Sequence, residues 1–162
     1  MNISKSESFL LPKHDFRLLV DSAPLFSIDL IVVDAERVLL GQRLNRPAQG
    51  AWFVPGGRVR KNETLHDAFT RLTAEELGRR MDYTAAIRLG IFEHFYSDSV
   101  FGEFPSTHYI AQGMLITGES TFSYLPAEQH GAFKFWPISE ALSDSRVHQY
   151  TKDYLRALKI ER

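Results

Sequence analysis

The chain has 162 residues, 44% of them hydrophobic, and a formal net charge of -1 at pH 7. This length and composition predict a single folded domain over residues 1–162. The balanced charge argues against nucleic-acid binding, and the absence of cysteine excludes disulfides, thiolate nucleophiles and thiolate zinc sites. A polar N-terminus and the lack of a long apolar run indicate a cytoplasmic protein with no membrane partner.

Helical and extended patterns alternate from the N-terminus onward. Residues 12–22 carry apolar side chains at helical spacing and predict a short helix. The β-branched run at 27–35 predicts a strand, and 38–43 its hairpin partner. A loop rich in Asn, Pro and Gly follows, and 51–55 predict a short strand that ends at two glycines.

The rest of the chain continues the same alternation. The next helix is expected to begin at Asn62 or Thr64 and to end before Gly78. The later predicted strands are 85–97, 107–117 and 132–138, and the later predicted helices are 139–142 and 150–161. Interleaved strands, hairpins and helices indicate an α/β protein with a mixed β-sheet covered by helices.

One acidic residue of the helix after the glycines lies on its apolar side. On a helical wheel, Glu76 falls within roughly 20° of Leu65, on a stripe that Phe69 and Leu72 continue. An ionised carboxylate there is costly unless it is paired or bound to a metal. Glu76 is therefore a candidate metal ligand, and oxygen ligands of this kind suit Mg²⁺ or Mn²⁺.

The neighbouring acid and the two glycines each allow two interpretations. Glu75 lies off the stripe, one turn after Arg71, where a simple i,i+4 salt bridge is the alternative to metal binding. Gly56 and Gly57 would let the backbone approach a metal and a diphosphate closely, but an ordinary turn also explains them.

These residues follow a recognisable spacing. Gly57, Glu63 and Arg71 are separated by five and seven residues, and Glu-Glu-Leu-Gly follows at 75–78. The pattern resembles the Nudix box, here residues 57–79. The resemblance implies an α/β/α sandwich with a mixed β-sheet and a hydrolase that uses a divalent metal on nucleoside diphosphates linked to another group.

The box departs from the usual Nudix pattern at two positions. Leu72 stands where a glutamate is usual, and Thr73 where an apolar residue is usual. This departure is similar to one subfamily, GDP-mannose mannosyl hydrolase, which the chain resembles over nearly its whole length. The segments that carry the resemblance are NRPAQGAWFVPGGRV, RLTAEELG, EHFYSD, THYI and LPAEQH. Glu75 is a difference, because the subfamily tends to lack that acid.

The resemblance implies a reaction in which water displaces GDP from the anomeric carbon of mannose with inversion, with GDP-glucose as a second possible substrate. Implied ligands of one Mg²⁺, for which Mn²⁺ can substitute, are the Gly56 carbonyl, Glu76 and Gln129, with His130 as the general base. Implied diphosphate contacts are Arg43, Arg58, Arg71 and Tyr109, and implied sugar contacts are Asp29 and His94. A homodimer is also implied, with the apolar stretch 9–12 as a candidate contact.

The residues support this chemistry without the resemblance. A glycosidase normally needs an acid to protonate an alkoxide leaving group, whereas GDP already leaves well once cations neutralise its charge. One base is then sufficient, and a histidine with a reference pKa of ~6.5 suits that role. His130 follows Gln129 in a polar loop predicted at 123–131.

Simpler roles remain open for each residue. His130 and Gln129 can be solvated, Asp29 can face solvent through strand alternation, and Arg43 can be a surface charge. Tyr109 and His94 can be packed core residues. Two other functions also remain open: a conventional Nudix pyrophosphatase acting on nucleotide sugars, which Glu75 favours, and a non-catalytic nucleotide-sugar sensor, which the loss of the glutamate at Leu72 favours.

Overall fold

The computed structural model describes residues 11–118 and 130–158. The first half contains α2 (Lys13–Ser22), β1 (Leu25–Asp34), β2 (Arg37–Arg43), β3 (Trp52–Phe53), β4 (Gly56–Arg58) and α3 (Leu65–Leu77). The second half contains η1 (Tyr83–Ala85), β5 (Ile87–Tyr96), β6 (Thr107–Thr117), β7 (His130–Pro137), α4 (Ile138–Ser143) and α5 (Gln149–Ala157). Part of the predicted 123–131 loop and part of the 9–12 stretch lie outside the described residues.

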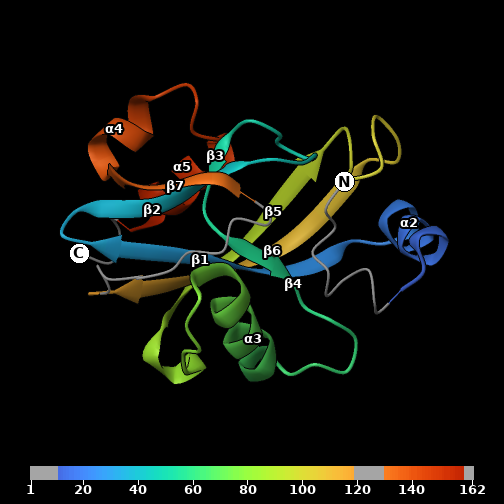
Figure 1. The fold of residues 1–162 in the computed structure, drawn as a ribbon, viewed down its shortest axis with the longest axis horizontal. Helices are drawn as coiled ribbons and strands as arrows, with labels where there is room; N and C mark the ends of the chain where they lie inside the picture. Colours follow the sequence, from blue (N-terminus) through green and yellow to red (C-terminus); the bar gives the residue numbers. More distant parts are fainter. Residues whose placement is uncertain (1–10, 119–129, 159–162) are drawn as a thin grey trace.

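Within the described residues, seven strands form one mixed sheet. Five follow the order β3-β2-β1-β6-β5, while β4 pairs with β1 and β7 pairs with β2. Strand β1 is parallel to β6 and antiparallel to β2 and β4. In Figure 1, α3 covers one face of the sheet, α4 and α5 cover the other, and α2 lies at the side. The predicted α/β/α sandwich with a mixed sheet is confirmed.

Side-chain alternation on β1 divides the core into two layers. Ile28 and Leu30 belong to the cluster that packs under α3, whereas Ile31 belongs to the cluster under α4 and α5. Both faces of β1 are covered, so Asp29, which lies between Ile28 and Leu30 in the strand, is also buried. The sequence-based alternative that Asp29 faces solvent is therefore wrong. No helix of the described residues has both the length and the apolar character needed to cross a membrane.

Within the predicted strand at 51–55 only Trp52–Phe53 is a strand, and a separate strand follows it. Trp52–Phe53 pairs with β2, but the chain then crosses to β1, where Gly56–Arg58 forms a second strand at the position expected to end the first. Pro55 lies at the crossing, where it has no N–H to donate to a ladder, and its carbonyl accepts a 2.8 Å hydrogen bond from the Leu30 amide. This crossing brings the two glycines beside the centre of the sheet.

Helix α3 begins and ends as its capping residues predict. The Thr64 side chain accepts a hydrogen bond from the Asp67 amide, and Gly78 ends the helix in the left-handed region at φ 71°. Leu65, however, is 36% exposed and does not extend the buried stripe, since it lies in the first turn. Phe69 and Leu72 do lie in the core.

The two glycines of β4 are needed for different close approaches. A Cβ on Gly56 would lie 2.6 Å from the Ile28 carbonyl oxygen and 2.5 Å from Oδ1 of Asp29. A Cβ on Gly57 would lie 2.6 Å from Cδ2 of Leu72. Backbone packing therefore requires glycine at 56, whereas glycine at 57 is matched to the leucine that replaces the usual glutamate of the box.

We predict that Gly56→Ala destabilises the protein more than Gly57→Ala. The cost of overpacking at Gly56 should be about 1 to 3 kcal/mol in the free energy of unfolding. The backbone atom that a Cβ on Gly56 would meet cannot move aside, whereas the end of the Leu72 side chain, which a Cβ on Gly57 would meet, can. Urea unfolding of both variants, alone and combined with Leu72→Ala, measures this. The Leu72→Ala change should relieve part of the cost of Gly57→Ala alone, and equal relief for both glycine variants would contradict the assignment.

Candidate functional site

An open pocket lies where β1, β2, β4, β5 and β6 meet α2. Its empty space, including the part open to solvent, is about 940 Å³. Six residues that the sequence indicates as site residues line it: Asp29, Arg43, Gly56, Arg58, His94 and Tyr109. The sheet brings together residues that are far apart in the chain.

Strand register accounts for this convergence. Asp29 on β1 pairs with Gly56 on β4, and His94 on β5 pairs with Tyr109 on β6. Because β1 and β6 are neighbours, the two pairs lie on the same part of the sheet. None of these pairings is visible as local spacing in the sequence.

Asp29 is a buried carboxylate held by an aromatic neighbour. It is 7% exposed, and the Tyr154 hydroxyl donates a 2.6 Å hydrogen bond to its Oδ2. Burial raises the pKa of Asp29 to about 6, even though the Tyr154 bond and the charge of Arg43 act to lower it. The residue therefore has a carboxyl group that changes charge close to neutral pH.

His94 is a buried, neutral partner of Asp29. Its ring stacks on Tyr150 with centroids 4.2 Å apart, and its Nδ1 lies 3.9 Å from Oδ2 of Asp29. Burial, followed by the charge of His148, lowers the pKa of His94 to about 4 although Asp153 opposes this. In the part of the chain that the structure describes, its buried Nε2 has no hydrogen-bond partner. That nitrogen can serve a ligand at the pocket wall.

Most of the charged side chains that line the pocket are cationic. Among the described residues that line it, three are arginines, namely Arg43, Arg46 and Arg58, and one, Asp29, is acidic. The Arg43 Nε donates to the Pro47 carbonyl at 3.3 Å. This composition suits an anion such as a diphosphate, which guanidinium groups recognise well.

Arg46 and Tyr96 are among the lining residues that sequence reasoning missed. Arg46 lies in the loop between β2 and β3, 3.8 Å from the Asp98 carboxylate, and Tyr96 is the last residue of β5. Both fall inside the NRPAQG and EHFYSD segments that carry the family resemblance. The conformation of the loop and the position of the strand bring these two side chains to the site, and their residue types alone do not indicate it.

Arg58 is fixed by an aromatic ring from the N-terminal helix. Its guanidinium lies over the Phe16 ring, 5.1 Å from the centroid, and the side chain is buried. Phe16 in turn packs against Phe101 at 5.6 Å. Helix α2 therefore completes one wall of the pocket and holds a cation there.

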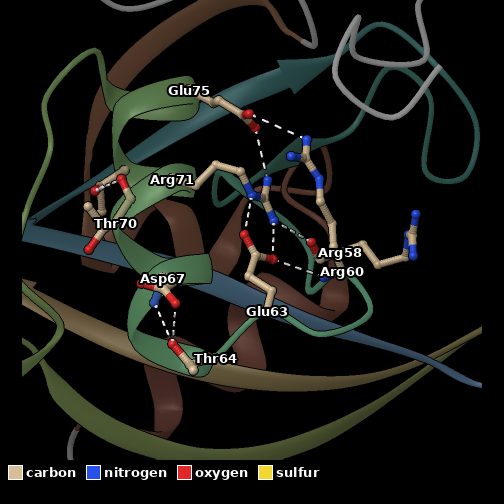
Figure 2. A network of polar contacts seen from close by, with 9 residues as sticks. Arg58, Arg60, Glu63, Thr64, Asp67, Thr70, Arg71 and Glu75 are labelled. Carbon is tan, nitrogen blue, oxygen red and sulfur yellow. Dashed lines mark hydrogen bonds and ion pairs between the residues drawn. The ribbon is translucent and has the colours of Figure 1, made fainter. Parts of the chain in front are cut away.

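A polar network connects α3 to the glycine segment (Figure 2). The Arg71 Nε and Nη2 donate to both Glu63 oxygens at 2.6 and 2.9 Å, and Nη2 also donates to the Arg58 carbonyl at 2.9 Å. The Arg60 amide donates to Glu63 as well. Burial acts to raise the pKa of Glu63, but these contacts lower it overall. The network fixes the backbone beside the pocket.

Arg71 lies in this network and is not among the residues that line the pocket. Its Nη1 also donates to Glu75 at 3.1 Å, which is the i,i+4 salt bridge that the sequence offers as an alternative for Glu75. Arg60 contacts the other oxygen of Glu75 at 3.5 Å. Two guanidinium groups therefore already balance Glu75, and the contact of Arg71 with a diphosphate stays a prediction.

Glu76 has the surroundings expected from the apolar stripe. It is 4% exposed and lies on α3 one turn after Leu72, which packs against Gly57.

Gln129 lies outside the described residues, as does the side chain of His130. The backbone of His130 is the strand partner of Arg43, so β7 enters the sheet beside the pocket.

The fold and site define a class of α/β protein with an arginine-lined pocket and a neighbouring helix that carries Arg71, Glu75 and Glu76. The NUDIX domain model matches residues 24–158, and the chain belongs to the NUDIX family. The low-salt glycan biosynthesis protein Agl8 of Haloferax volcanii is 43% identical over 149 residues, which cover 91% of this chain and 90% of Agl8.

Solved structures share the fold at lower identity. A MutT NUDIX hydrolase from Burkholderia pseudomallei has a TM-score of 0.69 and 24% identity, covering 85% of this chain and 99% of that one. The NUDIX domain of Shewanella oneidensis NrtR, in complex with ADP ribose, has a TM-score of 0.63 and 18% identity, covering 93% and 99%. These likenesses support the fold.

We predict that His94 makes folding stability depend on pH. Its pKa is lower in the folded protein than in the unfolded chain, so the unfolded chain binds the proton first as pH falls. Stability is fully retained above about pH 6.5 and falls, by at most about 3 kcal/mol, toward pH 4. Urea unfolding of wild type and His94→Gln between pH 4 and 7 measures the difference.

The control for this measurement is His14→Gln, which removes an exposed histidine from α2. The stability difference between wild type and His94→Gln should shrink steadily as pH falls from 7 to 4. A constant difference across that range would show that His94 is not held neutral by its surroundings.

Proposed function

We propose that this NUDIX hydrolase converts a GDP-sugar, GDP-mannose first and GDP-glucose second, to GDP and free sugar. Water would attack the anomeric carbon, the bond from that carbon to the phosphate oxygen would break, and GDP would leave with the electron pair. The observation that carries the proposal is Leu72, which lies in the core against Gly57 at the position of the usual glutamate. A box without that acid fits attack at carbon better than attack at phosphorus.

The pocket supports a nucleotide sugar as the substrate. Arg43, Arg58 and Tyr109 line the pocket and would contact the diphosphate. Asp29 and His94 offer buried acceptors for sugar hydroxyls. The name of the Haloferax relative places it in glycan biosynthesis, which is compatible with a nucleotide-sugar substrate.

A divalent cation is part of the proposed site. The Gly56 carbonyl, Glu76 and Gln129 would hold it, and all three are hard oxygen donors that suit Mg²⁺ or Mn²⁺. Within the described residues no group of three or more His, Asp or Glu side chains is placed to hold a metal, and the proposed set needs only one carboxylate. When bound, the cation would supply positive charge that stabilises the departing diphosphate.

His130 is the proposed base that takes the proton from water. Its residue follows Gln129 directly and pairs with Arg43 through the backbone, so it enters the sheet at the edge of the pocket. An uncharged histidine is a suitable proton acceptor at neutral pH. Neither Glu63 nor Glu75 of the polar network in Figure 2 is needed for this step, because both are engaged by arginines.

We predict that Glu76→Gln lowers kcat on GDP-mannose by on the order of 10²-fold and weakens Mn²⁺ binding, because it removes the single carboxylate of the proposed metal set. Glu75→Gln, the matched control one residue away, should cost much less, since Glu75 serves a salt bridge. Steady-state kinetics and Mn²⁺ titration by electron paramagnetic resonance measure both effects. Similar losses in the two variants would favour a site with more than one metal.

The bond that breaks can be determined directly. Hydrolysis of GDP-mannose in ¹⁸O-labelled water with Mg²⁺ should place the label in free mannose and leave GDP unlabelled, as mass spectrometry of both products would show. Release of GMP and mannose 1-phosphate, with label in a phosphate, would instead establish a pyrophosphatase. Tight binding of GDP-sugars without turnover would establish a sensor.

A further inference from the structure

We infer that Tyr154, in helix α5, is a positioning residue that fixes the Asp29 carboxylate for recognition of a sugar hydroxyl; this role rests on the proposed function. The Tyr154 hydroxyl donates to Oδ2 of Asp29 at 2.6 Å, and the tyrosine is fully buried. The other oxygen, Oδ1, lies toward Gly56 on the pocket wall. One carboxylate oxygen is therefore held by the helix, and the other side of the group is left for a ligand.

The tyrosine can only donate in this contact. Burial raises the pKa of Tyr154 far above its usual value, and the charge of Asp29 adds to the effect. The hydroxyl therefore keeps its proton, and a carboxylate is the acceptor for it. Since the bond runs from α5 to β1, it couples the C-terminal helix to the pocket.

The packing around the ring gives the hydroxyl one direction. Gly113 of β6 is in register with Asp29 on β1, and a Cβ there would lie 2.9 Å from Cε1 of Tyr154. Phe92 packs edge-on against the same ring at 4.5 Å. A side chain at Gly113 would displace the ring, so the glycine is what allows the hydroxyl to reach the carboxylate.

A second tyrosine of α5, Tyr150, holds the neighbouring histidine by ring stacking. The Tyr150 ring stacks on His94 with an interplanar angle of 9°, and its hydroxyl donates to the Phe95 carbonyl and accepts from the Phe95 amide, both at 2.8 Å. Nδ1 of His94 lies 3.9 Å from Oδ2 of Asp29, and the buried Nε2 has no hydrogen-bond partner among the described residues. Helix α5 therefore holds two polar side chains that line the pocket, Asp29 and His94.

The test compares Tyr154→Phe with wild type on GDP-mannose and on GDP-mannose analogues that each lack one ring hydroxyl. The phenylalanine keeps the ring packing and removes only the hydrogen bond. We expect kcat/KM on GDP-mannose to fall about 10- to 100-fold, as for loss of a hydrogen bond to a charged group. On the analogue that lacks the hydroxyl bound by Asp29, the same substitution should change kcat/KM less than about threefold. A merely structural role would lower kcat/KM by the same factor on every substrate and would overturn the inference.

Two further variants control the result. Tyr83→Phe also removes a tyrosine hydroxyl bonded to a buried side chain, since Tyr83 accepts from Gln112 at 2.8 Å on the other face of the sheet, and it should leave the sugar preference unchanged. Asp29→Asn combined with Tyr154→Phe should be no worse than Asp29→Asn alone, whereas additive losses would contradict a shared role. If Tyr154→Phe does not fold, Gly113→Ala provides the same comparison, because its Cβ would displace the Tyr154 ring and with it the hydroxyl.

Binding measurements separate this inference from the proposed function. By isothermal titration calorimetry, Tyr154→Phe should weaken GDP-mannose binding about 10-fold or more while leaving GDP binding unchanged, whether or not hydrolysis occurs. Binding of GDP-mannose without turnover rejects the proposed reaction and still tests Tyr154. Equal weakening of GDP and GDP-mannose, or no GDP-sugar binding by wild type, overturns the inference.

Discussion

The close approach of β4 to both β1 and α3 is the constraint on which the rest of the structure depends. Gly56 lies against the backbone of β1, and Gly57 lies against Leu72 of α3. The Arg71 network then fixes this segment to the helix. Because the same glycine backbone forms part of the pocket wall, packing of the core and geometry of the site are set by one contact.

Two polar side chains that line the pocket, Asp29 and His94, are buried in an environment that is unfavourable for their charged forms. Burial raises the pKa of Asp29 and lowers that of His94, so each group is held closer to its uncharged form than it would be in water. Two tyrosines of α5 compensate in part through a hydrogen bond and a stacked ring. Buried polar groups with this arrangement are typical of binding sites, where a ligand supplies the remaining contacts.

Much of the fold was predictable, because it depends on local periodicity and on capping residues. The strand at 107–117 agrees with β6 at both ends, and Thr64 and Gly78 cap α3 as expected. The end of β3 at Phe53 and the separate strand β4 from Gly56 were not predictable, since they depend on which neighbour each short segment pairs with. Leu65 was misplaced because wheel geometry takes no account of the exposed first turn of a helix.

The sequence by itself determined the family, because its motif is local. The spacing of Gly57, Glu63 and Arg71 and the buried position of Glu76 depend on one helix and the segment that precedes it. Only the tertiary structure decided what these groups contact. Arg71 is engaged with two acids, and Glu75 is balanced by two guanidiniums. The reason is physical: charge pairing and burial depend on side chains that converge across strands, and Tyr154 reaches Asp29 from 125 residues away.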